Sequence, residues 1–129
     1  MNGKFLLDTN IVIALFKNDS LVTNKLTTAK EVFISNITVG ELYFGAYKSN
    51  KIESNIKQID NFVASNIILN PDSTTAKYYG QIKNKLKIKG KPIPENDIWI
   101  ASVAMQYNLT LVSRDKHLQE IDNLSLQKW

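Results

Sequence analysis

The sequence predicts an α/β fold with a central parallel sheet flanked by helices on both faces. Short apolar runs such as KFLLD (4–8) and LTLVS (109–113) suit strands that are buried on both faces of a sheet. Helical patterns of ten residues or more separate these runs, which is typical of βαβ units with right-handed crossovers. The 129 residues, 43% of them hydrophobic and 22% charged, suffice for one domain, which we take as residues 1–129.

The strands are expected where a short apolar run ends at a turn residue or an acid. Such runs are bounded by Gly, Pro, Asn, Asp and Ser along the chain. The expected strands are residues 4–8, 32–35, 66–70 and 109–113, with 124–127 as a last edge strand, which gives a sheet of four to five strands.

Two helices are expected between the first and second strands. Asn10 is expected to cap a helix that ends at Phe16. The polar cluster at 18–20 should begin a second helix that ends near Lys30.

The later helices follow from the spacing of apolar residues and from their stop signals. In residues 52–65, Ile, Phe and Val recur at spacings of three and four. Gly90 and Pro92 should end the long helix, and Pro94 suits the first turn of the next one. The expected helices are residues 36–50, 52–65, 73–89 and 94–107, with a short one at 115–121.

The composition excludes several classes of protein. Because the chain has no cysteine, it has neither disulfides nor cysteine-ligated metal sites, so any metal must be held by oxygen ligands, helped at most by His117. The apolar run near the N-terminus is interrupted by Asp8 and Asn10 and is too short to span a bilayer. We therefore expect a cytoplasmic protein with no membrane association.

The positive charge is concentrated in one segment. The chain has 16 Lys and Arg against 12 Asp and Glu, and residues 77–91 contain six lysines and no acid. Lysines neutralise phosphates in nucleic-acid complexes, whereas lysines late in a helix also suit its negative dipole end and a solvated surface. Both readings stay open for the candidate RNA contacts Lys83, Lys85, Lys87, Lys89 and Lys91.

Four acids are placed where they could meet. Asp8 ends the first strand and Asp115 follows the fourth, and ligands of parallel sheets bind at the carboxyl ends of the strands. Glu41 and Asp97 each have largely apolar neighbours three and four positions away, so both should project from helix faces fit for burial. The alternatives are helix caps for the three aspartates and an exposed side chain for Glu41.

Convergence of the four carboxylates would require a cation or protonation. At about 6 Å and an effective dielectric near 20, each pair repels by roughly 3 kcal/mol, so six pairs approach about 17 kcal/mol. A domain is stable by only about 5 to 15 kcal/mol. All-oxygen ligation favours Mg²⁺ or Mn²⁺, and such an ion activates water for attack on phosphorus.

Four motifs in order and spacing resemble a known family. LLDTNI, TVGELYFGA, PENDIWIA and LVSRDKHL are similar to the PIN-domain nucleases, specifically the VapC-type toxins of toxin–antitoxin pairs, and the likeness covers essentially the whole chain. It implies a PIN-like single domain and Mg²⁺- or Mn²⁺-dependent endoribonuclease activity on structured RNA. It also implies a homodimer and a cognate antitoxin.

The resemblance assigns roles to residues that match its motifs. It implies that the metal-binding and catalytic acids are Asp8, Glu41, Asp97 and Asp115, and that the supporting polar residues are Thr9, Asn10, Asn96 and Ser113. The family often has Thr and Phe where this chain has Ser113 and Leu118. Arg114 is either a phosphate clamp or a surface cation, and His117 is not expected in catalysis because metal-activated water needs no imidazole base.

Partner contacts and other functions stay open. Aromatic residues could meet the antitoxin or a second copy, although such residues more often pack in a core: Tyr43, Phe44, Tyr47, Tyr78 and Tyr79. The alternatives to the toxin are a non-catalytic RNA-binding domain, a DNA or flap-type nuclease, and a receiver-type phosphoacceptor domain. The receiver reading would need Asp72 as its phosphorylated residue, although Asp72 lies beyond a proline.

Overall fold

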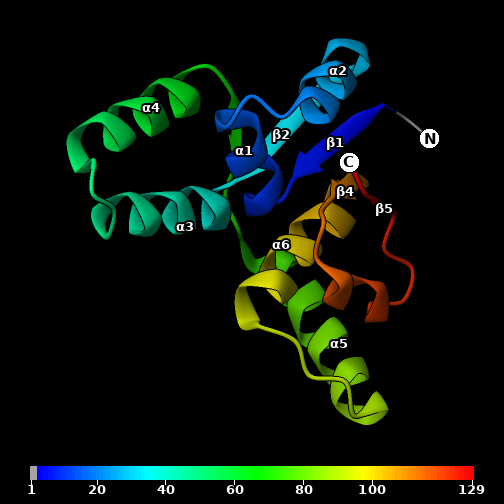
Figure 1. The fold of residues 1–129 in the computed structure, drawn as a ribbon. Coiled ribbons are helices and arrows are strands. Elements are labelled where there is room, and N and C mark those ends of the chain that lie inside the picture. The colour runs from blue at the N-terminus through cyan, green and yellow to red at the C-terminus, as the bar shows by residue number, and fades with distance from the viewer. Residues whose placement is uncertain (1–2) are drawn as a thin grey trace.

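A five-stranded, entirely parallel sheet forms the centre of residues 3–129, the part of the chain that the computed structural model describes (Figure 1). The strand order is β3-β2-β1-β4-β5. The strands are β1 (Lys4–Leu7), β2 (Glu31–Ser35), β3 (Ile67–Leu69), β4 (Thr110–Val112) and β5 (Leu126–Gln127). The predicted fold class is confirmed. Residues 1 and 2 of the predicted 1–129 domain lie outside the described residues.

The strand order places a topological switch at the centre of the sheet. From β1 the chain winds outward through β2 to β3, and it then returns to build β4 and β5 on the other side of β1. Leu7 at the end of β1 pairs with Val112 at the end of β4. Because crossovers diverge at such a point, ligands of parallel sheets commonly bind beside the residues that follow these strands, here β1 and β4.

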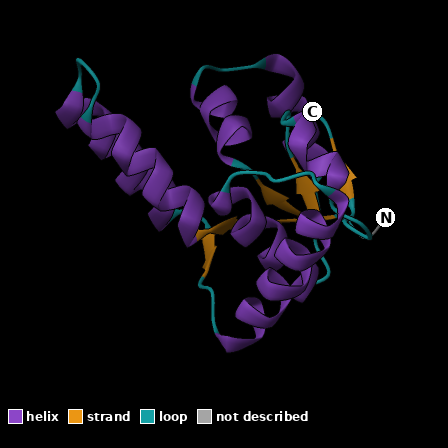
Figure 2. Ribbon diagram, turned by 90° about the horizontal axis from the view of Figure 1, so that it is seen from below, coloured by secondary structure: helices purple, strands orange, loops and turns teal. Residues whose placement is uncertain are grey.

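Helices cover both faces of the sheet. In residues 3–129 the helices are α1 (Thr9–Phe16), α2 (Ser20–Thr28), α3 (Asn36–Tyr47), α4 (Ile52–Ala64), α5 (Ser73–Lys89), α6 (Glu95–Gln106) and the short 3₁₀ helix η1 (Lys116–Glu120). The helices α1 to α4 lie on one side and α5 and α6 on the other, and the α3–α4 hairpin projects away from the sheet (Figures 1 and 2). None of these helices has both the length and the hydropathy that a bilayer span requires.

Alternate residues of β1 point into two separate cores, as the twofold period of a strand requires. Phe5 and Leu7 pack against α1 to α4, in a cluster that also contains Trp129. Leu6 is fully buried on the opposite face, where it packs with residues of α5, α6 and β4 such as Leu86 and Leu111. The end of β1 is therefore clamped between two apolar layers.

Two local predictions were wrong. Asp8 rather than Asn10 caps α1, because β1 ends at Leu7 and the Asp8 carboxylate accepts the Thr9 N–H. Ile52 was expected on the apolar stripe of α4 but is 43% exposed, because the projecting hairpin removes the start of α4 from the core.

The hydrogen bonds of Asp72 do not fit a phosphoacceptor residue. It is the N-cap of α5, and its carboxylate accepts hydrogen bonds from the backbone N–H groups of Thr74 and Thr75 and from the Gln106 side chain. Asp72 follows β3, an edge strand, so it lies away from the switch point between β1 and β4. This arrangement argues against the receiver-type alternative.

Candidate active site

Asp8 is a buried carboxylate at the carboxyl end of β1, with 4% of its surface exposed. Its Oδ1 accepts the Thr9 N–H at 2.8 Å, and its Oδ2 accepts the Ser113 hydroxyl at 2.7 Å. Burial raises the pKa of Asp8, the two hydrogen bonds lower it, and the charges of Glu41 and Asp115 raise it further. Asp8 is thus held in place at the edge of the sheet and lies within electrostatic range of two other acids.

Ser113, which follows β4, connects three parts of the site. Its hydroxyl donates to Asp8 and accepts the Asp115 N–H at 3.0 Å and the Asn10 amide at 3.3 Å. The Asn10 carbonyl oxygen in turn accepts the Arg114 N–H at 3.1 Å. These bonds fix the start of α1 against the turn after β4, so the predicted supporting residues Asn10 and Ser113 lie between the acids.

Asp97 lies in the first turn of α6 and is half-buried. Its pKa is raised from 3.8 to about 7, first by burial, then by Asp8, by its contact and charge interaction with Asp115, and by Glu41. The N-cap of α6 is Pro94, so Asp97 is not a capping residue. The charges of all three other predicted acids raise the pKa of this one carboxyl, so the four lie within electrostatic range of one another.

Glu41 reaches the cluster from α3. Its Oε1 accepts the Thr9 hydroxyl, and its Oε2 accepts the Asn96 amide at 3.4 Å. Glu41 is half-buried rather than enclosed, and its helical neighbour Phe44, expected on the same apolar face, is 66% exposed. The predicted supporting residues Thr9 and Asn96 therefore hold the two oxygens of this carboxylate.

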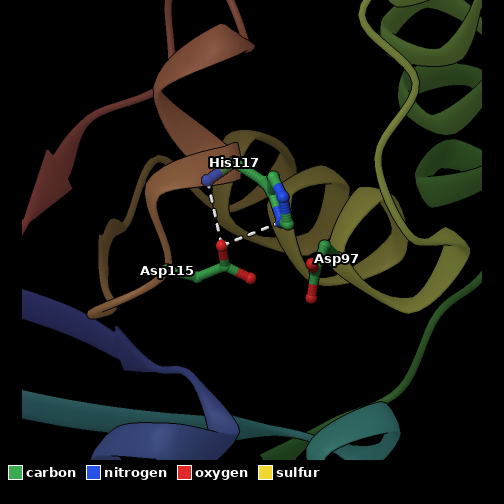
Figure 3. Close-up of side chains that lie close together, drawn as sticks. All are labelled: Asp97, Asp115 and His117. Atoms are coloured by element: carbon green, nitrogen blue, oxygen red, sulfur yellow. Dashed lines mark hydrogen bonds and ion pairs between the residues drawn. The ribbon is translucent and has the colours of Figure 1, made fainter.

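Asp115 is the N-cap of η1, and the His117 side chain lies beside its carboxylate (Figure 3). Its Oδ1 accepts the His117 N–H at 2.9 Å and lies 3.1 Å from the ring Nδ1. Ligand atoms of Asp97, Asp115 and His117 all lie within 4.8 Å of one another. The sequence interpretation allowed His117 at most to help hold a metal and gave it no catalytic role, and the signal that points to it is its position two residues after an acid that caps a tight turn.

The donor set fits a divalent cation. The negative charges of Asp8, Glu41 and Asp115 repel that of Asp97 and so raise its pKa, and the group of ligand atoms close enough for one ion in the described residues is that of Asp97, Asp115 and His117. A hard cation relieves this repulsion, and carboxylate oxygens are the ligands that Mg²⁺ and Mn²⁺ prefer. The candidate ligands are Asp8, Glu41, Asp97 and Asp115.

Arg114 uses its guanidinium within the protein. Its Nη2 lies 3.0 Å from Asp19 Oδ2, and its Nε donates to the Trp129 backbone oxygen at 2.6 Å. These contacts join the turn after β4 to the start of α2. A phosphate contact would have to share or replace them, so the clamp reading of Arg114 stays a prediction.

The lysines of the basic segment divide into two groups. Lys83 pairs with Glu95, and Lys89 lies 3.4 Å from Asp122 and donates to the Glu120 backbone oxygen. In the described part of the chain, no such ion pair involves Lys85, Lys87 or Lys91, which are exposed. RNA contact by any of the five stays a prediction, and the unpaired three are the better candidates.

The family is identified by comparison with known proteins. A family model described as the PIN domain matches residues 5–124. The chain belongs to the PIN domain family. This PIN domain is 39% identical over 129 residues to Ribonuclease VapC2 of Haemophilus influenzae, with 98% of each chain covered. It is 32% identical over 129 residues to the tRNA(fMet)-specific endonuclease VapC of Shigella flexneri, again with 98% of each covered.

A solved relative has nearly the same fold. The crystal structure of VapBC2 from Rickettsia felis, bound to a DNA fragment from their promoter, contains a chain that superposes with a TM-score of 0.90 and 34% identity. The alignment covers 98% of both chains. The PIN domain described here therefore shares its fold with this chain of the VapBC2 complex over 98% of its length.

Proposed function

We propose that this PIN domain is an endoribonuclease that depends on a divalent metal and acts as the toxin of a toxin–antitoxin pair. The observation that carries the proposal is the convergence of Asp8, Glu41, Asp97 and Asp115 at the switch point of the sheet. The names of the relatives support RNA over DNA as substrate, since they are a ribonuclease and a tRNA(fMet)-specific endonuclease. An RNA substrate is consistent with the cytoplasmic location expected from the sequence.

The roles of the residues follow from their contacts. When bound by the four carboxylates, Mg²⁺ or Mn²⁺ supplies activation of the attacking water and neutralises charge on the phosphodiester. Ser113 holds Asp8 in one orientation, while Thr9 and Asn96 hold Glu41. Asp97 stands at the positive end of α6, which favours its ionised form once a cation is present. The supporting residues thus fix the carboxylates before the substrate arrives.

The test is cleavage of structured RNA by the purified protein, with tRNA(fMet) included among the substrates. We expect cleavage with Mn²⁺ or Mg²⁺ and none with EDTA. Asp8→Asn and Asp97→Asn should each lower the rate by at least about a hundredfold, because each removes a ligand charge. Glu53→Gln, at an exposed acid on α4, is the matched control. Undiminished cleavage by both site variants would refute the proposal.

The antitoxin is proposed to dock on the projecting hairpin. A cavity of about 590 Å³ lies between α1, α3 and α4, and Leu42, Ile59 and Glu41 are among its lining residues. On another face of α3, Phe44 and Tyr47 are 66% and 65% exposed. Exposed aromatic residues and apolar cavities are typical of protein interfaces, and the solved relative was crystallised as a VapBC complex.

This docking can be tested with a cavity-filling change. A Cβ added at Gly45 meets nothing within 4 Å, so Gly45→Trp should fold while its side chain occupies the cavity that Gly45 helps to line. We expect the variant to lose binding to a cognate antitoxin and to keep its fold, which circular dichroism and melting measure. Gly80→Ala on α5, also with open space around it, is the control. Loss of a proposed homodimer instead, seen by light scattering, would reassign the surface to a second copy.

A further inference from the structure

His117 stands in the candidate active site although neither its sequence motif nor the acidic cluster requires it there. The turn after Asp115 sets its position, because the Asp115 carboxylate caps η1 by accepting the His117 N–H at 2.9 Å. The side chain therefore lies on the same side as the carboxylate, as Figure 3 shows, with Nδ1 3.1 Å from Oδ1. The imidazole is 62% exposed, so no packing prevents it from turning about its side-chain bonds.

The three side chains are close enough to share one ion. Ligand atoms of Asp97, Asp115 and His117 lie within 4.8 Å of one another. Metal–ligand bonds of about 2.0 to 2.2 Å separate opposite ligands of one ion by roughly 4.3 Å. Small rotations of an exposed imidazole and a half-buried carboxylate cover the difference. The site thus offers a nitrogen donor beside its oxygen donors.

We propose that His117 is a nitrogen ligand of the active-site metal and biases this PIN domain toward Mn²⁺ and against Mg²⁺. The inference rests on the proposed function for the existence of the metal, and it adds the choice of ion. Imidazole binds first-row transition ions, whereas Mg²⁺ keeps oxygen ligands and water. The other acids do not supply this selectivity, because Asp8 and Glu41 offer only carboxylate oxygens.

The chain offers a direct readout, because His117 is its one histidine. Tag-free protein loaded with Mn²⁺ is examined by pulsed electron paramagnetic resonance for the coupling of a directly bound imidazole ¹⁴N. We expect this coupling in the natural protein and its loss in His117→Phe, which keeps a ring without a donor. Titration calorimetry should show Mn²⁺ affinity falling about tenfold in the variant while Mg²⁺ affinity changes less than about twofold. Gln119→Ala, exposed on the same 3₁₀ helix, should behave as the natural protein in both measurements.

The outcomes separate the ligand from other roles and from the proposed function. Absence of the ¹⁴N coupling in the natural protein overturns the inference, even if His117→Phe binds Mn²⁺ less well, because His117 would then only orient Asp115. An equal loss of Mn²⁺ and Mg²⁺ affinity also overturns it. RNA cleavage without nitrogen coupling removes this inference alone, whereas nitrogen coupling without RNA cleavage removes the proposed function alone.

Discussion

At the scale of single residues, Asp8 and Asp97 show how two carboxyls with raised pKa differ in their surroundings. Both Asp8 oxygens accept hydrogen bonds, which partly offset the effect of its burial. At Asp97 burial and three neighbouring acids all act in the same direction, and its pKa rises to about 7. The ionised form of Asp97 is therefore opposed both by burial and by repulsion from the neighbouring acids.

Asp97→Asn should stabilise the metal-free protein at pH 8. The folded-state pKa of Asp97 is raised above its unfolded value of 3.8, so the folded protein binds more protons between pH 4 and pH 7, and stability falls as pH rises through that range. Because the carboxyl is only half-buried, we expect a gain of about 1 to 2 kcal/mol at pH 8, below the full value of the shift. Melting curves in EDTA at pH 4.5 and pH 8 measure it, and the gain should vanish at pH 4.5.

A control variant and a contradicting outcome accompany this prediction. Glu53→Gln removes an exposed acid from α4 and should not raise the melting temperature at pH 8. An unchanged or lowered melting temperature of Asp97→Asn at pH 8 would contradict the repulsion within the cluster.

Ser113→Ala should weaken metal binding although Ser113 is not a ligand. The change removes the donor to Asp8 and the acceptor for the Asp115 N–H, both in a buried setting. We expect about 10- to 100-fold lower metal affinity and a loss of about 1 to 3 kcal/mol in stability. Calorimetric metal titration and melting measure the two effects. Ser113→Thr keeps the hydroxyl, and if it fails as badly as Ser113→Ala, the hydrogen bonds are not the cause.

At the scale of elements, periodic segments were predicted well and their contacts less so. The buried helix α6 and the strands β1 and β4 follow from local patterns, since long apolar periods leave few alternatives. The cap of α1 was wrong because Asp8 and Asn10 are both good capping residues, and only the end of β1 decides between them.

Contacts between distant segments explain what the sequence could not reveal. Arg114 pairs with Asp19 across 95 positions, and Lys83 pairs with Glu95 across the turn between α5 and α6. Such partners depend on how helices pack, not on local pattern. The position of His117 beside Asp97 was not predicted for a related reason, because it requires both the η1 turn and the docking of α6.

Asp72→Ala should lower the melting temperature by loosening α5 from α6. Asp72 caps the first turn of α5 and also accepts the Gln106 amide at 3.0 Å. Hydrogen bonds lower the pKa of Asp72, first that of the Thr75 N–H, so its contribution is present above the unfolded value and is lost as pH falls through the folded pKa. Melting at pH 7 and pH 3 tests this, with a smaller difference between Asp72→Ala and the natural protein at pH 3. Asp72→Asn should retain most of the stability at pH 7.

At the scale of the whole molecule, the sheet explains why the sequence could predict that Asp8 and Asp115 lie near each other. Acids that follow β1 and β4 must meet if these strands are neighbours, and the strand order makes them neighbours. The convergence of Glu41 and Asp97 was predicted less directly, from their helix faces alone. Their final positions depend on how α3 and α6 pack against each other, where the Asn96 amide donates to Glu41 at 3.4 Å.

Divalent metal should stabilise the folded chain as a whole. A ligand at 100 times its Kd that binds only the folded state adds about 2.7 kcal/mol. For a chain of this size we expect the melting temperature to rise by roughly 10 °C with saturating Mn²⁺, and by far less in Asp8→Asn. Differential scanning calorimetry with and without EDTA measures the effect. Equal shifts in both proteins would place the ion elsewhere.

Glu41 belongs at once to the acidic cluster and to the wall of the cavity beneath the α3–α4 hairpin. A partner seated in that cavity and an ion held by the cluster therefore act on the same carboxylate. Thermodynamic reciprocity then requires that any factor by which such a partner changes metal affinity is also the factor by which metal changes the affinity for that partner. Through this shared side chain, the supply of metal would itself tune how tightly the partner is bound.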